Sequence, residues 1–293
     1  MDNWDEIRTA YQVARAGTVS GAAEVLGVHH ATVIRHVDAL EKRLGEKLFH
    51  RHARGYATTE AGRDLLTVAQ ITEDQFAQLA NRIRGKGETV SGDLALTSIA
   101  DISAQMVQCM VAFQTLYPEV TPRFLTGQRL FRLDYGEAHV AVRAGAAPAQ
   151  ADYVVQPFMD LRHALYASAS YAAANGLPET DADLADHRFV VSDETSSRAP
   201  YSRWLQAVTP TPALRFRASD PAAMYQAISA GAGIGFISRV AASSYPDLIE
   251  VMPPRPEWDV PLWLVTHIDL HRTLKVQRFL SHLKETAVIW RRL

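Results

Sequence analysis

The sequence has little that marks a secreted, membrane-spanning or cross-linked protein. Its 293 residues include one cysteine, Cys109, so no disulfide can form within the chain. It has no apolar run of the roughly 20 residues that a membrane-spanning helix needs. It also has no signal peptide with a basic start and an apolar centre. We therefore expect a cytoplasmic protein that does not associate with membranes.

An excess of charge of one sign is also absent. The chain has 30 Lys and Arg against 32 Asp and Glu, a formal net charge of -2. This balance excludes a general attraction to nucleic acid, so any contact with DNA must rest on local charge. One such region exists, because from Arg35 to Arg54 the basic residues Arg35, Lys42, Arg43, Lys47, Arg51 and Arg54 outnumber the acidic ones.

Signatures of catalysis are missing too. The sequence contains no Gly-rich phosphate-binding loop, no nucleophile elbow and no HExxH zinc motif, and no pair of carboxylates has an evident activating partner. An enzyme is therefore disfavoured, although a cleft between two α/β lobes could host catalysis. A solute-binding protein of the periplasmic type is a further alternative, which the missing signal peptide disfavours.

The most informative stretch is 19–49, which predicts two helices joined by a tight turn. The first helix covers roughly residues 20–26 and is followed by Gly27, the residue best suited to a left-handed helix end. The second covers roughly 31–44, and its apolar residues recur as one buried stripe of Val33, Val37, Leu40 and Leu44. Its opposite face is polar and partly basic. These are the parts of a helix-turn-helix, whose second helix lies in the major groove of DNA.

Two flanking segments complete this unit. Residues 1–16 predict a helix that ends at Gly17 and packs on the helix-turn-helix through the stripe Trp4, Ile7, Tyr11 and Ala14. Residues 50–59, HRHARGYATT, predict a small β-hairpin, or wing, with basic side chains around Gly55. A plain solvated turn is the alternative for this segment.

A long helix is predicted next, from the N-cap Thr59 to about Arg84. Its seam residues alternate in steps of four and three, as in a short heptad pattern: Leu65, Ala69, Thr72, Phe76, Leu79 and Ile83. An exposed seam on a long helix indicates dimerisation, and the alternative is that the helix packs on its own chain. The polar segment 85–92, GKGETVSG, predicts a linker.

From Asp93 the pattern changes to alternating strands and helices, which predicts an α/β domain with parallel strand pairs. We expect strands in 93–99, 120–126, 138–145, 163–170, 188–193, 214–219, 234–239 and 261–267, and helices in 104–118, 130–137, 181–187, 197–208, 221–233 and 274–293. Crossings near 157–161 and 262–265 would divide this domain into two lobes. A cleft between two lobes is a common place for a small ligand.

The chain resembles the LysR-type transcriptional regulators over its whole length. The strongest similarity is in 22–62, with the ordered elements Ala22-Ala23, Leu40-Glu41, Leu44-Gly45, Leu48-Phe49, Arg51 and Thr59-Glu60-Ala61-Gly62. AFQTLYPEV, YGEAHVAVRAG and AISAGAGIGFIS each resemble a segment of the family's effector-binding domain. The resemblance implies binding near a promoter, a small-molecule effector in the cleft, and a tetramer that is often a dimer of dimers.

The predicted fold is α/β, with a winged helix-turn-helix, a long dimerisation helix and a two-lobed effector domain like a type 2 periplasmic binding protein. The expected boundaries are 1–58, 59–90 and 91–293, with lobe I in about 91–160 and 265–293 and lobe II in about 161–264. The predicted function is a sequence-specific transcriptional regulator, not an enzyme, that binds double-stranded promoter DNA and a small-molecule effector. It would dimerise through 59–84 and form a tetramer, without a cofactor or a metal.

The start of the second helix departs from the family pattern. Where the family has Ser, a polar residue and then Pro or Ser, this chain has His29-His30-Ala31, and a later polar position is Ile34. Histidine is a weaker N-cap than serine, so the sequence fixes this helix start less well. A base preference therefore does not carry over from other members.

Candidate DNA contacts lie on the polar face of this helix and on the wing: His29, His30, Thr32, Arg35, His36, Arg51 and Arg54. Arg35 is the strongest, because a guanidinium can read guanine with two hydrogen bonds or grip a phosphate. His36 could equally be half-buried helix surface. A metal site formed by these histidines with His50 and His52 is disfavoured, because no cysteine is near and an exposed helix suits a closed site poorly.

Candidate effector contacts are strand ends and the starts of the following helices, where free N–H groups favour polar ligand atoms: Ser98, Ala100, Asp101, Ile102, Thr126, Gly127, Gln128, Ser192, Asp193, Ser219 and Asp220. Asp101 could instead cap the helix that begins after it. If Asp101 faces the cleft, it favours an amine or a hydroxyl over a carboxylate. Cys109 lies inside an apolar helix and is expected to be core rather than a redox sensor.

Overall fold

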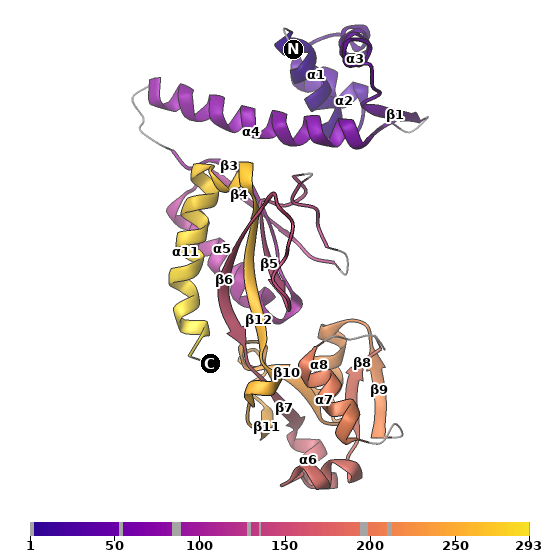
Figure 1. Cartoon of the computed structure of the whole chain (residues 1–293), viewed down its shortest axis with the longest axis vertical. Coiled ribbons are helices and arrows are strands. Elements are labelled where there is room, and N and C mark those ends of the chain that lie inside the picture. Colours follow the sequence, from indigo (N-terminus) through magenta and orange to yellow (C-terminus); the bar gives the residue numbers. More distant parts are fainter. Residues whose placement is uncertain are drawn as a thin grey trace.

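The computed structural model describes residues 3–52, 55–83, 89–127, 130–134, 136–193, 199–209 and 213–292. The chain forms an N-terminal helical unit, a five-stranded lobe I and a smaller lobe II, which follow one another along the long axis (Figure 1). Within the described residues, no helix is long and apolar enough to cross a membrane.

The N-terminal unit is a winged helix-turn-helix, as predicted. It consists of α1 (Trp4–Ala16), α2 (Val19–Leu26), α3 (His30–Leu44) and the antiparallel wing strands β1 (Phe49–His52) and β2 (Gly55–Thr58). Gly17 and Gly27 end α1 and α2 in the left-handed conformation, which glycine adopts without steric cost. Val33, Val37 and Leu40 are fully buried under α1 and α2, so the stripe on α3 builds the core of this unit.

Two members of the predicted apolar stripes are not core residues. Leu44 is 37% exposed and Trp4 is 60% exposed. Both lie at helix ends, where the three-helix core no longer covers them, and both line a groove between α1 and the long helix. The prediction that they are buried within this unit was therefore wrong.

The long helix α4 (Glu60–Ile83) packs across the winged unit. The hydroxyl of Thr59 accepts a hydrogen bond from the Gly62 N–H at 3.1 Å, so Thr59 is the predicted N-cap. A Cβ added at Gly62 would lie 2.0 Å from the Leu48 carbonyl oxygen. Glycine is therefore required here, because the helix backbone touches the segment that leads into the wing.

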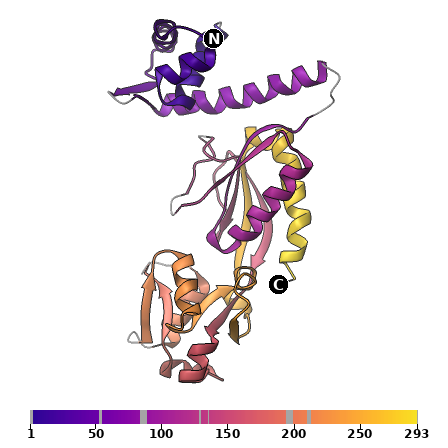
Figure 2. The ribbon, with the colours of Figure 1, turned by 180° about the vertical axis from the view of Figure 1, so that it is seen from behind.

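Lobe I is a five-stranded sheet in the order β4-β3-β5-β12-β6. Its elements are β3 (Gly92–Thr97), η1 (Ala100–Ile102), α5 (Ser103–Leu116), β4 (Val120–Leu125), β5 (Val140–Ala144), β6 (Tyr153–Leu161), β12 (Val260–His267), α10 (Ile268–His271) and α11 (Leu274–Trp290). Helices α5 and α11 lie side by side on one face of the sheet (Figures 1 and 2). The Phe113 and Phe279 rings meet there edge to face at 5.2 Å.

Lobe II has a three-stranded sheet, β10-β7-β11, and a parallel pair, β8 and β9. Its elements are β7 (His163–Ser168), α6 (Ala169–Asn175), η2 (Asp181–Asp186), β8 (Phe189–Ser192), α7 (Pro200–Val208), β9 (Leu214–Ala218), α8 (Pro221–Ser229), β10 (Gly235–Ser238), α9 (Arg239–Ala242), β11 (Leu248–Met252) and η4 (Pro256–Trp258). The chain enters this lobe at Arg162, between β6 and β7, and leaves it before β12.

The structure corrects three expectations for this domain. The described residues of 130–137 are turns rather than a helix, because Gly136 has a positive φ and buried Leu133 packs on the sheet. Residues 157–161, predicted as a crossing between the lobes, are the second half of strand β6. This strand tolerates Pro157 because it lies at the edge of the sheet and has a register shift next to the pair Pro157–Trp263. Among the described strands, the parallel pairs are β3-β4, β3-β5 and β8-β9, with an isolated parallel bridge between Phe189 and Ile234, whereas β12 returns from lobe II and runs antiparallel to β5 and β6.

Candidate functional site

The outer face of α3 presents most of the predicted DNA contacts. His29, His30 and Arg35 are exposed and Thr32 is half-buried. His29 occupies the N-cap position of α3, and its side chain makes no capping hydrogen bond, so its ring remains available for a contact with DNA. Arg35 makes no hydrogen bond or ion pair with the described residues. An unpaired guanidinium on an exposed helix face is available to a base edge or a phosphate.

Two other residues predicted to contact DNA, Arg51 and His36, bind to side chains of the protein itself. Arg51 forms ion pairs with Asp38 at 2.5 Å and with Glu41 at 3.1 Å. The Thr9 hydroxyl donates to the Asp5 carbonyl at 2.6 Å, so it accepts a hydrogen bond from Nδ1 of His36 at 2.9 Å. These side chains therefore brace α3 against the wing and against α1. Arg54 lies outside the described residues.

A buried carboxylate holds α3 to the wing. Glu41 is 3% exposed, and its Oε1 accepts hydrogen bonds from the N–H groups of Leu48 at 3.0 Å and Phe49 at 3.3 Å. Its Oε2 faces Lys47 at 2.7 Å and Arg51. Burial opposes ionisation, but the hydrogen bonds and the two cations prevail and lower the pKa of Glu41. Both oxygens are thus committed to structure.

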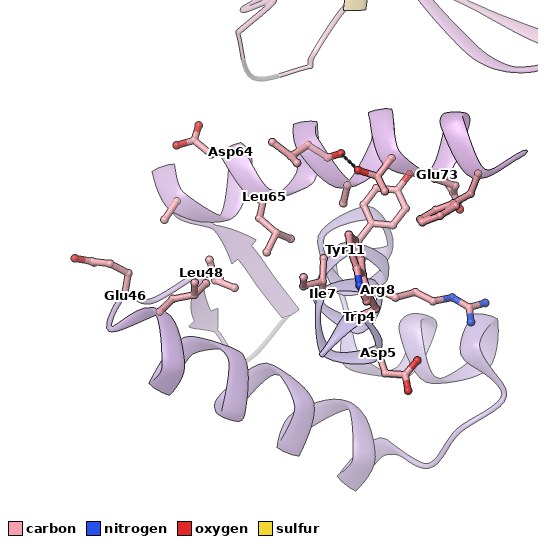
Figure 3. Close-up of a pocket in the computed structure, with 16 residues that line it drawn as sticks. Trp4, Asp5, Ile7, Arg8, Tyr11, Glu46, Leu48, Asp64, Leu65 and Glu73 are labelled. Atoms are coloured by element: carbon pink, nitrogen blue, oxygen red, sulfur yellow. Dashed lines mark hydrogen bonds between the residues drawn. The ribbon is translucent and has the colours of Figure 1, made fainter. Parts of the chain in front are cut away.

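An apolar groove of about 750 Å³ runs between α1 and α4 (Figure 3). Ile7, Leu48 and Leu65 form its floor, while Tyr11 reaches α4 and donates a hydrogen bond to Glu73 at 2.8 Å. Phe76 and Trp4 meet edge to face at 6.1 Å, yet each remains more than half exposed. The first half of the predicted seam therefore packs on its own chain, and the second half stays open.

A cleft of about 1240 Å³ opens along the carboxyl ends of β3, β4 and β5 and the start of α8. The predicted effector contacts that line it are Ser98, Ala100, Asp101, Thr126, Gly127, Asp193, Ser219 and Asp220. Ile102 does not line it, because its side chain is fully buried in the lobe I core. Ser192 is absent from the lining as well, and Gln128 lies outside the described residues.

Asp101 bridges the two lobes at this cleft. Tyr225 of α8 donates a hydrogen bond to Asp101 Oδ1 at 2.6 Å, and His163 Nε2 lies 3.8 Å from the same oxygen. Burial and the Asp101 charge raise the pKa of the Tyr225 phenol, which keeps it a donor. Asp101 therefore does not cap the following helix, whose N-cap position belongs to Ile102 and has no side-chain hydrogen bond. Oδ2 of Asp101 has no partner among the described residues.

Arg143 was not among the predicted contacts, and it lines the cleft from the penultimate position of β5. Its guanidinium donates to the Phe131 carbonyl at 3.1 Å and lies over the Tyr153 ring at 5.3 Å. The predicted contacts in lobe I lay at the carboxyl ends of β3 and β4 and did not include the carboxyl end of β5. A lone cation in the otherwise apolar stretch VAVRA was the signal that could have revealed it.

The geometry of the described residues supports neither a metal site nor a redox-sensing cysteine. Within the described ranges, no three His, Cys, Asp or Glu residues cluster as metal ligands. Cys109 is 1% exposed in the lobe I core, and burial raises the pKa of its thiol to about 11 despite a hydrogen bond with Thr286. A protonated, inaccessible thiol is a poor redox sensor, so the prediction that Cys109 is core is confirmed.

Comparison with known proteins assigns both parts of the chain. Residues 4–63 match the family of bacterial regulatory helix-turn-helix proteins of the lysR type, and residues 87–288 match the LysR substrate binding domain. An HTH-type transcriptional repressor of Pseudomonas aeruginosa is 25% identical, covering 97% of this chain and 92% of that protein. A probable HTH-type regulator, LtrA of Klebsiella pneumoniae, is 26% identical over 94% and 92%.

Solved structures share the fold. CrgA of Neisseria meningitidis, a LysR-type regulator, superposes with a TM-score of 0.57 at 23% identity over 97% of this chain and 99% of that one. Full-length LysG of Corynebacterium glutamicum, with bound effector Arg, gives 0.66 at 20% identity over 98% of both chains. The two family matches, at 4–63 and 87–288, show that the chain belongs to the LysR family of transcriptional regulators, with a helix-turn-helix DNA-binding domain and an effector-binding domain.

Proposed function

We propose that this regulator binds double-stranded promoter DNA through the exposed face of α3, with His29, His30, Thr32 and Arg35 as the contacts to bases and phosphates. The observation that carries the proposal is Arg35, an exposed cation without a partner among the described residues on the predicted recognition helix. Arg51 and His36 would act indirectly, by holding α3 in place. Since its partner is chromosomal DNA, we expect the protein to act in the cytoplasm.

The test is affinity for a duplex from the region upstream of its own gene, against a scrambled duplex of equal length. Neutralising phosphates with cations makes affinity fall steeply with salt concentration, and base contacts make it depend on sequence. We expect a salt-dependent affinity that is at least tenfold higher for the upstream duplex. Equal affinity for both duplexes would mean that the protein binds DNA through charge alone, without sequence specificity. No binding at low salt would refute DNA binding altogether.

For self-association, we propose that the open half of α4 pairs with a second copy of the chain. In this half, Phe76, Leu79 and Ile83 are between 43% and 77% exposed, and Phe76 also lines the apolar groove. Contiguous apolar surface of this kind indicates a protein interface. A separate apolar strip on α5, where Val107 and Val111 are 44% and 58% exposed one turn apart, offers a second interface. Two different interfaces are what a tetramer built from dimers requires.

We also propose the boundaries 1–58, 59–90 and 91–293 for the DNA-binding domain, the linker helix and the effector domain. For the lobes, the start of β12 at Val260 supports a return to lobe I near residue 260 rather than near 265. The proposed effector contacts are the predicted residues that line the cleft, with Arg143 added: Ser98, Ala100, Asp101, Thr126, Gly127, Asp193, Ser219 and Asp220.

For the effector, we propose a cationic or hydroxyl-rich small molecule rather than a carboxylate. Asp101, Asp193 and Asp220 line the cleft, and Asp220 already caps the start of α8 by accepting a hydrogen bond from the Ala222 N–H. The N-terminus of α8, which would suit an anion, is thus occupied by the protein's own carboxylate. The one basic residue among the described lining residues, Arg143, already donates to a main-chain carbonyl of its own wall.

A matched pair of probes tests this effector class. Calorimetry would compare 1,4-diaminobutane with butanedioate, which have four carbons each and opposite charge, on wild type and on Asp101→Asn. We expect binding of the diamine only, weakened at least tenfold in Asp101→Asn and unchanged in Asp247→Asn, which alters an exposed carboxylate away from the cleft. Binding of the diacid alone would refute the class and leave the DNA-binding proposal standing.

A further inference from the structure

A buried histidine joins the effector domain to the linker helix. His139, 1% exposed, precedes β5 and pairs twice with Ala95 of β3. Its N–H donates to the Ala95 carbonyl at 2.7 Å, and its Nδ1 accepts from the Ala95 N–H at 2.7 Å. Because Nδ1 must offer a lone pair to that N–H, the proton of the neutral imidazole is on Nε2.

Nε2 of His139 points to α4 of the N-terminal unit. It lies 3.3 Å from the side-chain amide of Gln70, a residue 69 positions away in the sequence. The Gln70 atom at this position is assigned as the amide nitrogen, but two donors cannot bond to each other. Because Nε2 of His139 carries the proton, the amide turns its oxygen towards the ring and accepts the hydrogen bond. Burial, together with the charges of Lys275 and Arg123, lowers the pKa of His139 to about 3, so the ring stays neutral near pH 7.

The same junction is closely packed one turn earlier on α4. Thr67 is 5% exposed, and a Cβ built on Gly136 would lie 3.1 Å from its hydroxyl oxygen. Arg15 of α1 adds an ion pair with Asp93 of β3 at 3.7 Å, and it is held by Glu73 of its own helical unit at 3.6 Å. Three contacts from different segments therefore fix the helical unit on lobe I.

The strand that follows His139 is also a wall of the effector cleft. Ala141, Val142 and Arg143 of β5 line the cleft. Only one residue, Val140, separates His139 from this wall. A ligand that shifts β5 must therefore move His139 or strain its hydrogen bonds to Ala95 and Gln70.

We propose that His139 and Gln70 form a latch that fixes α4 on lobe I and transmits the position of β5, and with it the state of the cleft, to the DNA-binding unit. The proposal rests on effector control of DNA binding and names the residues through which it acts. His139 and Gln70 are positioning residues in this scheme and touch neither DNA nor effector.

The first test is a disulfide between Thr67→Cys and Gly136→Cys. A Cβ at Gly136 would lie 3.7 Å from the Thr67 Cβ, within the roughly 3.5–4.5 Å range of disulfides. Cys109 is buried and should not compete. We expect a cross-link within one chain, seen as a faster-migrating monomer on a non-reducing gel. A cross-link between chains, or none in a folded double variant, would overturn the proposed junction.

The second test avoids the strain of a side chain at Gly136. Hydrogen exchange would be compared between Gln70→Ala and Gln75→Ala, a matched change at an exposed position on the same helix. We expect exchange over 60–72 to rise at least fivefold in Gln70→Ala and to stay within twofold of wild type in Gln75→Ala. Equal rates in the two variants would overturn the latch.

The third test addresses transmission without any ligand. Arg143→Ala perturbs β5 from the cleft side. In the chain without the cross-link, we expect this variant to raise hydrogen exchange over residues 60–72 at least threefold. In the cross-linked chain, we expect no such rise. No change in the free chain would overturn transmission through β5. None of these readouts depends on DNA, so their failure is distinguishable from failure of promoter binding.

Discussion

Glu41 and Asp101 are two carboxylates that differ in how many of their oxygens are hydrogen-bonded within the protein. Glu41, at the junction of α3 and the wing, accepts hydrogen bonds on both oxygens from within its own unit. Asp101, at the cleft, gives Oδ1 to Tyr225 of the other lobe and has no described partner for Oδ2. The comparison shows how a structural carboxylate differs from one that is available to a ligand.

The difference has an energetic basis. A buried carboxylate with all its hydrogen bonds made stabilises the fold, and its removal leaves buried donors unpaired. A carboxylate with a free oxygen in a cavity contributes less to folding and keeps the capacity to bind a donor. The variants below separate these roles, starting with the largest expected effect on stability.

Glu41→Ala should produce the largest loss. It leaves the N–H groups of Leu48 and Phe49 without their acceptor and removes the partner of Lys47, so we expect about 3 kcal/mol of destabilisation. Urea unfolding followed by circular dichroism would measure it. Glu24→Ala, on an exposed face of α2, is the control and should change the free energy of unfolding by less than about 0.5 kcal/mol. Similar values for both variants would contradict the structural role of Glu41.

Acidification should produce the next effect. The pKa of His139 falls from an ordinary 6.5 to about 3 in the folded state, so between these values the unfolded chain binds the extra proton. Stability from this group is therefore lost as the pH falls below 6.5, by about 2 kcal/mol at pH 5. Glu41, whose pKa is lowered, loses its contribution only below its ordinary 4.5. His139→Gln should flatten the decline between pH 7 and 5 in thermal melts, and an unchanged decline would contradict the assignment.

Asp101→Asn should have the smallest effect on stability. The amide oxygen can still accept the Tyr225 hydrogen bond, so we expect a loss below about 1 kcal/mol. The same variant should lose at least tenfold in affinity for the diamine probe. A loss as large as that of Glu41→Ala would show that Asp101 is structural and would remove the contrast between the two carboxylates.

The sequence predicts well what short-range patterns determine. The ends of α1 and α2 follow from Gly17 and Gly27, and the hairpin follows from the basic, Gly-containing segment after α3. Heptad spacing on α4 indicated an interface but not that half of it packs on α1 of the same chain. Eight of the proposed cleft residues line the cleft because strand ends converge in any such sheet.

Contacts distant in sequence could not be predicted. Tyr225 lies 124 residues from Asp101, and no periodicity links them. The sequence also does not distinguish a free arginine from a paired one, because the partners of Arg51 lie 13 and 10 residues back on α3 and reach it only when the wing folds. Arg35 and Arg51 were therefore predicted alike and differ in the structure.

That difference gives the most direct test of DNA recognition by α3. Gel-shift binding to the upstream duplex would be measured for Arg35→Ala and for Arg278→Ala, an exposed arginine on α11 without a partner among the described residues. We expect Arg35→Ala to lose at least tenfold in affinity for the upstream duplex and to retain weak binding to a scrambled one, while Arg278→Ala stays within twofold of wild type. Wild-type affinity in Arg35→Ala would contradict recognition through the exposed face of α3.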